Sequence, residues 1–415
     1  MDYNLQQLIC TKVGIILHSV TAKQHPSSAS FIRLYVLAFF FFAANSALTI
    51  ILPLRSEAAG MNQAEIGLIM GAYMFTCMLL RPFAAQLIGR YGPLSVMKWL
   101  LCAHAVLLFI YTVSGTEQYL WLRALQGAIT AFFSMTMQVG IVESLENKDR
   151  AQGLSMYTLF TMVPSLVIPI AALQIWQNNS ELLFALLMIV LAAGPLFIFY
   201  RAALPKRTVQ DKTYTLRDMA ASLGTIWKSP PLLISSIVML LASCVFGATA
   251  TFLPLFMLAA GSGDAGVYLT IQGLVVITCR FVLRKKIPSN GSWNTWLMAG
   301  MLLSAALGSQ LLAMLDIVGT FVYVSAVFNG FAVALLYPTL TTYLSFILPE
   351  KTRYVLMAIF LSSYDLGFSL GGFAMGILLQ SSSYSAMFTC CTLLSVTAAL
   401  IIILSKRTME AKPAP

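Results

Sequence analysis

Ionisable side chains are scarce within the apolar stretches of this sequence, and the few that occur there are candidates for chemistry. Asp365 stands near the middle of the stretch 354–379, and no other acid lies as deep in such a stretch. A charged group in a hydrocarbon environment is costly, and it is retained when it is paired, hydrated or used. Asp365 is therefore predicted to bind and release a proton or another cation. The alternative is a structural acid, bonded to Ser362, Ser363 or Tyr364 at a helix bend.

Three arginines lie in other apolar stretches of the sequence. Arg123 belongs to the stretch 119–142, where it is either directed inward or acts as an anchor that reaches the membrane surface. Arg81 and Arg280 lie near the same end of their own stretches. A structural role, either pairing with an acid or reaching the membrane surface, is the first expectation for these two residues.

The composition requires membrane-spanning helices to position these residues. Hydrophobic residues make up 59% of the 415 residues and charged residues 10%, whereas soluble domains are roughly half apolar and a quarter charged. A chain of this length supplies about a dozen spans of roughly 20 residues each. The net charge of +10 does not indicate nucleic-acid binding, because no segment combines clustered basic residues with aromatic residues on a soluble module.

Apolar stretches bounded by polar residues, glycine or proline predict where the spans lie. They are near residues 31–54, 66–88, 94–113, 119–142, 153–176, 182–200, 231–258, 266–283, 293–315, 318–348, 354–379 and 384–404. A polar break divides these spans into two equal groups. We therefore expect an all-α membrane protein with twelve helices, in a bundle of six at 31–200 and a second bundle of six at 231–405, joined by a linker at 201–230.

Basic residues indicate how these spans are oriented. The linker is rich in lysine and arginine, and if it is cytoplasmic, the terminal segments 1–30 and 406–415 are cytoplasmic as well. The loops on the other side contain only Arg55 as a basic residue. This asymmetry predicts a multi-pass protein of a bacterial plasma membrane. Within 1–30, apolar residues at helical spacing around Lys12 indicate either an interfacial helix or a disordered tail.

The two groups of spans resemble each other, which is typical of transporters built from internal repeats. Equal order and equal topology indicate an approximate two-fold axis along the membrane normal, with a central crevice between the bundles. At offsets of 199 to 203 residues, the matching pairs are Leu52-Pro53-Leu54 with Leu253-Pro254-Leu255, Arg81 with Arg280, Gln126-Gly127 with Asn329-Gly330, and the segments 145–150 and 348–353.

With this repeat, residues 31–406 resemble the major facilitator superfamily. One family signature in the fourth span is an arginine separated by two residues from a Gln-Gly pair, as Arg123 and Gln126-Gly127 are here. The resemblance implies the fold of two six-helix bundles and a secondary transporter that works by alternating access. It also implies that Arg123 faces inward and competes for, or expels, the proton that Asp365 would carry.

A second family signature, between the second and third spans, is incomplete in this sequence. Arg90 and Gly92 match it, but Gly89 replaces the acid that the signature normally contains. Glu143, at the same end of the fourth span, is the expected counter-ion of Arg81 or Arg90. We predict that such a pair closes the cytoplasmic side. The residues expected to take part in gating are Arg81, Gly89, Arg90, Gly92, Glu143 and Arg280.

Polar uncharged residues in the spans are candidates to line the crevice and contact a substrate. The alternative for each is a hydrogen bond between packed helices. These residues are Asn45, Gln126, Gln138, Asn329, Tyr337 and Tyr364. Four glycines of the eleventh span, at positions 367, 371, 372 and 376, form two pairs with helical spacing and predict close helix packing.

Several classes of function are disfavoured by what the sequence lacks. It has no GxxxxGK[ST] loop for ATP and no HExxH motif, so we expect neither an ATP-driven pump nor an enzyme, no cofactor and no bound metal. A receptor without transport activity would normally add a soluble domain. We therefore expect a monomeric transporter of a small organic molecule, driven by a proton gradient across the lipid bilayer.

Export is the expected direction of transport. Short strings around Arg81 and Asp365 resemble those of bacterial efflux permeases, which include drug exporters and exporters of opine-type metallophores. The 21 methionines and 26 phenylalanines suit an adaptable apolar pocket. Uptake of a small metabolite, by a permease or a facilitator, stays open as the alternative.

Overall fold

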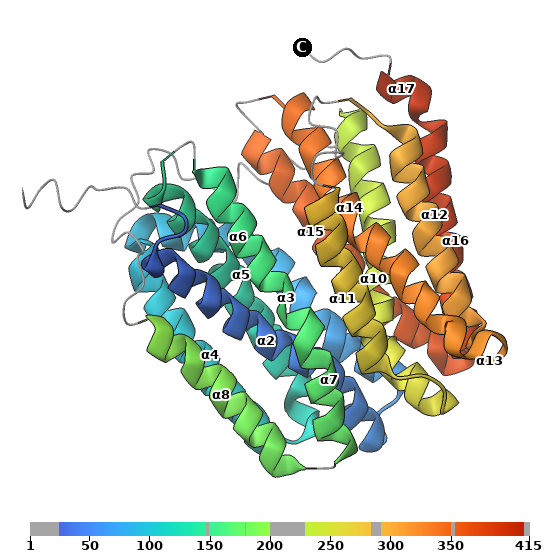
Figure 1. The fold of residues 1–415 in the computed structure, drawn as a ribbon, viewed down its shortest axis with the longest axis horizontal. Coiled ribbons are helices and arrows are strands. Elements are labelled where there is room, and N and C mark those ends of the chain that lie inside the picture. The colour runs from blue at the N-terminus through green and yellow to red at the C-terminus, as the bar shows by residue number, and fades with distance from the viewer. Residues whose placement is uncertain are drawn as a thin grey trace, which may run out of the picture.

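The computed structural model is a bundle of long α-helices (Figure 1). It describes residues 25–146, 149–178, 180–199, 229–283, 292–349 and 353–410. Twelve helices in these ranges are long and apolar enough to cross a membrane, as the sequence predicted. Large apolar side chains such as Trp99, Trp121 and Phe197 point outward from them, which suits a surface covered by lipid. The predicted helix around Lys12 and most of the linker lie outside the described residues.

Helices of the first half follow the predicted spans, with one exception. Their bounds are α2 Ala29–Ala58, α3 Gln63–Tyr91, α4 Pro93–Val113, α5 Tyr119–Ser144, α6 Arg150–Met162, α7 Pro164–Gln177 and α8 Glu181–Phe199. The fifth span, predicted to be continuous, is divided into α6 and α7. Pro164 occupies the first position of α7, where its missing N–H costs least, and this explains the division.

Helices of the second half repeat this arrangement. Their bounds are α10 Pro230–Ala260, α11 Ala265–Val282, α12 Thr295–Ala313, α13 Leu315–Val318, α14 Val322–Ile347, α15 Arg353–Ser381, α16 Tyr384–Leu404 and α17 Lys406–Glu410. The short helix α17 occupies part of the segment that was predicted to be a tail. We call the end of the bundle at which α8 finishes and α10 begins the linker end, and the opposite end the far end.

The turn between α3 and α4 depends on a glycine. Gly92 has a φ of 78° and separates the last residue of α3 from Pro93, the first residue of α4. A positive φ is strained for residues with a side chain and is available to glycine at little cost. The final glycine of the incomplete family signature thus has a clear structural reason.

Helix contacts confirm the internal repeat. The helix α3 packs on α5 as α11 packs on α14, and α4 packs on α8 as α12 packs on α16. Between the halves, α3 packs on α15 as α11 packs on α7. The Gln-Gly and Asn-Gly matches lie at equivalent crossings, because Gly127 approaches the main chain of Tyr73 and Gly330 that of Gln272.

The two halves meet mainly at the far end. One cluster of buried residues joins the first half to far-end residues of the second half such as Phe252 and Tyr268. Residues of the second half nearer the linker end, including Trp293 and Tyr343, form a separate cluster. In Figure 1, α7 and α11 accordingly lie side by side, whereas α6 and α15 diverge toward the end that carries α17.

Glycines form the seam between α3 and α15. A Cβ at Gly67 would meet the carbonyl carbon of Gly372 at 2.9 Å, and one at Gly71 would meet the carbonyl oxygen of Ser369 at 2.7 Å. Both distances are too short for a side chain, so only glycine lets the two main chains approach this closely. The predicted close packing of the eleventh span is confirmed: Gly372 and Gly376 face α3, while Gly367 and Gly371 face α10.

Candidate functional site

Asp365 forms an ion pair with Arg81 across the two halves of the protein. The Nε of Arg81, on α3, lies 2.8 Å from Oδ2 of Asp365, on α15, and Nη2 donates to Oδ1 at 3.2 Å. The Asp365 side chain is 1% exposed and that of Arg81 is 25% exposed. The pair therefore consists of a buried carboxylate and an arginine whose side chain is still partly exposed.

The serines next to Asp365 are engaged elsewhere. Ser362 donates to the carbonyl oxygen of Ala358, and Ser363 donates to that of Phe360. The alternative in which Asp365 is a structural acid bonded to these serines is therefore not what the structure shows. The acid that pairs with Arg81 in this structure is thus Asp365, whereas the sequence indicated Glu143 as the counter-ion of Arg81 or Arg90.

Glu143 does not contact Arg81 in this structure. The basic residue that acts on its carboxylate is Arg150, at the start of α6. Arg90 is exposed and lies over the ring of Tyr91, 5.4 Å from the ring centroid, and Gly89 lies one residue earlier in α3. The predicted pair concerns a protein closed at the linker end, so for that state it stays a prediction.

Arg123 is buried in the first half, where its partners are neutral. Its Nη1 donates to Oδ1 of Asn45 at 3.0 Å and to Oε1 of Gln126 at 2.8 Å. Its Nη2 donates to Oγ1 of Thr49 at 3.1 Å, and its guanidinium lies 4.9 Å from the ring centroid of Tyr73. With 2% of its surface exposed, Arg123 is not an anchor at the membrane surface.

The structure thus brings together three of the residues that the sequence singled out, Arg123, Asn45 and Gln126. Thr49 and Tyr73 were missed. Thr49 follows Asn45 by one helical turn, and this spacing places both side chains on the same face of α2. That signal could have identified Thr49, whereas the contact with Tyr73 depends on how α3 packs against α5.

Asn329 lies in a hydrogen-bonded cluster inside the second half. Its Nδ2 donates to the hydroxyl of Tyr268 at 2.9 Å, and that hydroxyl lies 2.8 Å from Oγ of Ser325. Ser325 in turn donates to the carbonyl oxygen of Gly308. Only 2% of Asn329 is exposed. These contacts join α11, α12 and α14, which matches the helix-packing alternative for Asn329.

Two tyrosines and Arg280 gather near the ion pair. The ring centroids of Tyr337, on α14, and Tyr364, on α15, are 5.8 Å apart. Both phenols lie within electrostatic range of Arg280, and Tyr337 also lies within range of Arg81 and Asp365. Both tyrosines are partly exposed, consistent with the predicted lining role. Gln138 is exposed on α5.

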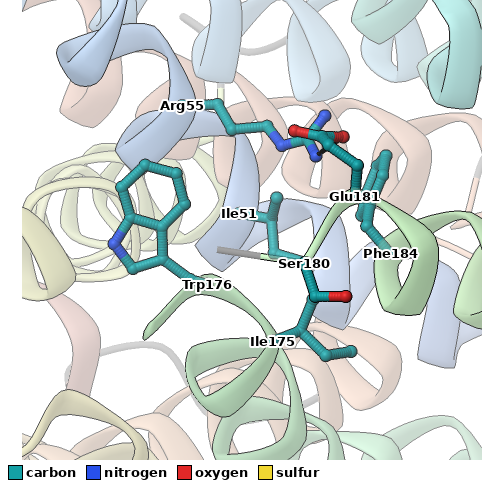
Figure 2. A pocket seen from close by; sticks show the side chains of 7 residues that line it. All are labelled: Ile51, Arg55, Ile175, Trp176, Ser180, Glu181 and Phe184. Atoms are coloured by element: carbon teal, nitrogen blue, oxygen red, sulfur yellow. Dashed lines mark hydrogen bonds and ion pairs between the residues drawn. The ribbon is translucent and has the colours of Figure 1, made fainter. Parts of the chain in front are cut away.

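A small pocket at the far end of the first half lies apart from this cluster. Figure 2 shows Arg55 of α2 directed toward Glu181 at the start of α8, with Phe184 beside them. Arg55 forms an ion pair with Glu181, and its guanidinium lies 4.0 Å from the ring centroid of Phe184. Trp176 and Ile51 complete the wall. These contacts join α2, α7 and α8, and they give the pocket a structural explanation.

The fold and the buried ion pair between repeats are those of a membrane transporter with two homologous bundles. Consistently, the sequence model of the protein family described as the Major Facilitator Superfamily matches residues 34–312 and 293–415. The chain belongs to this superfamily, and it is a transporter rather than an enzyme. A staphylopine export protein of Staphylococcus aureus (strain Mu50 / ATCC 700699) is 39% identical over 383 residues, which cover 91% of this chain and 96% of that protein.

Solved structures confirm the fold. A mutant of the nucleoside transporter NupG superimposes with a TM-score of 0.76 at 15% identity, covering 90% of this chain and 98% of that one. A bacterial homologue of the human lysosomal transporter Spinster, inward-facing and unoccupied, gives a TM-score of 0.72 at 13% identity, covering 92% and 98%. A POT family transporter in complex with 5-aminolevulinic acid gives 0.74 at 12% identity, covering 91% and 96%.

Proposed function

We propose that this protein exports an opine-type metallophore such as staphylopine across a bacterial plasma membrane. The observation that carries the proposal is the 39% identity to a staphylopine export protein over 91% of this chain. Similarity of that extent includes residues of both halves. The partly exposed tyrosines and arginines near Asp365 offer hydrogen bonds and positive charge to a polar, metal-chelating molecule.

Alternating access is the mechanism that the architecture favours. The two bundles meet at the far end through the glycine seam of α3 and α15. If the linker end is cytoplasmic, as the positive-inside rule predicts, this structure is the inward-facing state, and a substrate enters from the cytoplasm. Both termini then lie in the cytoplasm. A monomer is sufficient, because the contacts that open and close lie between the halves of one chain.

Proton coupling is assigned to Asp365 and Arg81. In this state the carboxylate is ionised and paired with the guanidinium. A proton that arrives on Asp365 removes the negative charge, so the attraction that joins α3 to α15 at this level is lost. Proton entry and the movement of one half against the other are thereby linked. Arg123, which has no acidic partner among the residues that the structure describes, repels protons from the far-end side of the first half.

Secretion by living cells tests the proposed substrate and its direction. Cells that synthesise staphylopine but lack their own exporter should release it into the medium when they express this chain. A protonophore should stop the release, because the proton gradient supplies the energy. Staphylopine that stays inside such cells, at an expression level confirmed by immunoblot, would contradict export of this substrate. Accumulation of external staphylopine inside the cells would instead favour uptake.

A further inference from the structure

Arg280 has the same place in the second repeat as Arg81 in the first. The two are separated by 199 positions, and each lies on the helix that contributes to the contact between the halves. Arg81 belongs to α3, which packs on α15, and Arg280 belongs to α11, which packs on α7. The two arginines are therefore expected to have equivalent surroundings.

Contacts between the halves establish this equivalence. Gly71 of α3 lies against the carbonyl oxygen of Ser369 on α15. In the other repeat, Thr270 of α11 donates to the carbonyl oxygen of Leu166 on α7 at 2.9 Å. Gly71 and Thr270 are offset by 199 positions, and Leu166 and Ser369 by 203. In both repeats, equivalent helix positions therefore contact equivalent carbonyl oxygens of the other half.

At an offset of 203 positions, Met162 is the residue of the first repeat that is equivalent to Asp365 in the second. Met162 is the last residue of α6, and its side chain packs against the apolar cluster of the second half. The side chain of Asp365 also contacts the other half of the protein, because it forms an ion pair with Arg81 on α3. The first repeat therefore supplies a thioether where the second supplies a carboxylate.

Arg280 consequently has no acidic partner among the described residues. Its Nε donates to the carbonyl oxygen of Ala334 at 3.1 Å, and the phenols of Tyr337 and Tyr364 are the groups within electrostatic range. The residue is partly exposed, and its terminal nitrogens have no described hydrogen-bond acceptor. A cation that lacks a counter-ion in a membrane-spanning segment is costly to keep unless it is used.

Arg123 provides an internal comparison. It also lacks an acid, but neutral oxygens of Asn45, Gln126 and Thr49 occupy both of its terminal nitrogens. Arg280 has one hydrogen bond, through Nε, and its terminal nitrogens donate to no described group. Of these two arginines without an acidic partner, Arg280 is therefore the one whose terminal nitrogens stay available.

We propose that a carboxylate of the transported molecule binds the guanidinium of Arg280, in the relation that Asp365 has to Arg81. An arginine fork accepts a carboxylate through two parallel hydrogen bonds, and the phenols of Tyr337 and Tyr364 can donate to the same anion. Molecules that chelate divalent metals present carboxylate oxygens and nitrogen donors. The inference rests on the proposed function only for the identity of that molecule.

Binding to the purified full-length protein tests this assignment. Staphylopine is titrated in a calorimeter against the wild type and Arg280→Gln, and the same is done with staphylopine whose carboxylates are methyl esters. We expect Arg280→Gln to weaken staphylopine binding by about tenfold or more, with Arg280→Lys intermediate. The ester should bind both proteins equally weakly. Equal binding of staphylopine to wild type and Arg280→Gln would overturn the assignment.

A second variant tests the repeat relation without altering Arg280. Met162→Asp places a carboxylate at the position equivalent to Asp365, where it should pair with Arg280 and weaken staphylopine binding by about tenfold. Met162→Asn has nearly the same shape without the charge, and it should bind within about threefold of the wild type. Equal effects of Asp and Asn would count against the proposal.

Citrate separates the site from the identity of the substrate. If the wild type binds no staphylopine but citrate raises its melting temperature, and Arg280→Gln abolishes the rise, the carboxylate site stands and the proposed substrate falls. If staphylopine is exported but its binding is unaffected by Arg280→Gln, the proposed function stands and this inference falls. A wild type that binds neither compound refutes both.

Discussion

Asp365 and Arg81 come from opposite halves of the chain, 284 positions apart. The depth of Asp365 in its span was evident from the sequence, because it lies eleven residues after the predicted start of the span at residue 354. Its partner was not, because pairing across the interface depends on how two bundles pack, and the nearest acid by topology was Glu143. The sequence thus located the charged residues but could not pair them.

We predict that Asp365→Asn uncouples transport. Asparagine keeps the size and the hydrogen-bonding capacity of the side chain but cannot bind and release a proton. In proteoliposomes with an imposed pH gradient, accumulation of staphylopine should fall to background, whereas exchange of labelled for unlabelled staphylopine should stay within about twofold of the wild type. Both rates are measured on the same preparation, at matched protein content.

The opposite result is equally informative for this residue. If Asp365→Asn still concentrates staphylopine with the pH dependence of the wild type, the ion pair with Arg81 is structural. The stability of Arg81→Gln then serves as the matched control for a structural role of the ion pair. It would leave a buried carboxylate unpaired and destabilise the protein, by about 3 kcal/mol if the loss is typical of such pairs.

At the scale of elements, glycines determine how close α3 and α15 come. The spacing of four glycines predicted close packing, and this prediction is confirmed. Which helix each pair contacts was not predictable, because Gly371 and Gly372 are neighbours that face α10 and α3 respectively. The division of the fifth span was also missed: Pro164 was visible in the sequence, but its apolar surroundings favoured a continuous helix.

We predict that Gly67→Val opens the far end. The added side chain would overlap the main chain of Gly372, and overpacking costs about 1–3 kcal/mol, enough to shift a two-state equilibrium by about 5- to 150-fold. Spin labels at the exposed residues Glu117 and Ile317 report the far-end separation by pulsed electron resonance. The labelled variant should show a longer distance than the labelled parent.

Gly300 supplies the control for that experiment. Apart from the neighbouring main chain of its own helix, no atom lies within 4 Å of where its Cβ would stand, so Gly300→Val should leave the distance distribution unchanged. If the Gly67→Val protein is folded and shows the distances of the parent, then α3 and α15 accommodate the added side chain without separation of the far end.

At the scale of the whole molecule, the alternating access proposed above requires the far end to separate. Asn62 precedes α3 and Gln380 lies near the end of α15, and Nε2 of Gln380 donates to Oδ1 of Asn62 at 2.9 Å. This hydrogen bond joins the halves at the far end. It would have to break in every cycle if the two bundles alternate between two arrangements.

We therefore predict that a short bridge between cysteines at these two positions stops turnover. In Asn62→Cys/Gln380→Cys, a bifunctional methanethiosulfonate should reduce staphylopine transport to background, while binding of staphylopine in detergent persists because the linker end stays open. A reducing agent should restore transport. The single variants, treated identically, control for the seven native cysteines. Full transport by the bridged protein would exclude alternating access through this interface.

The glycine seam also bears on how such proteins diversify. Its contacts involve the main chain, which substitutions elsewhere leave in place. Under our proposal, the groups that bind the transported molecule are instead side chains such as Arg280, Tyr337 and Tyr364. A homologue could change those side chains and acquire a new substrate without any change in the surfaces of α3 and α15 that meet at the far end. If the proposed gate and binding site are correct, gate and selectivity are inherited separately, and one ancestral gate can serve transporters of chemically unrelated molecules.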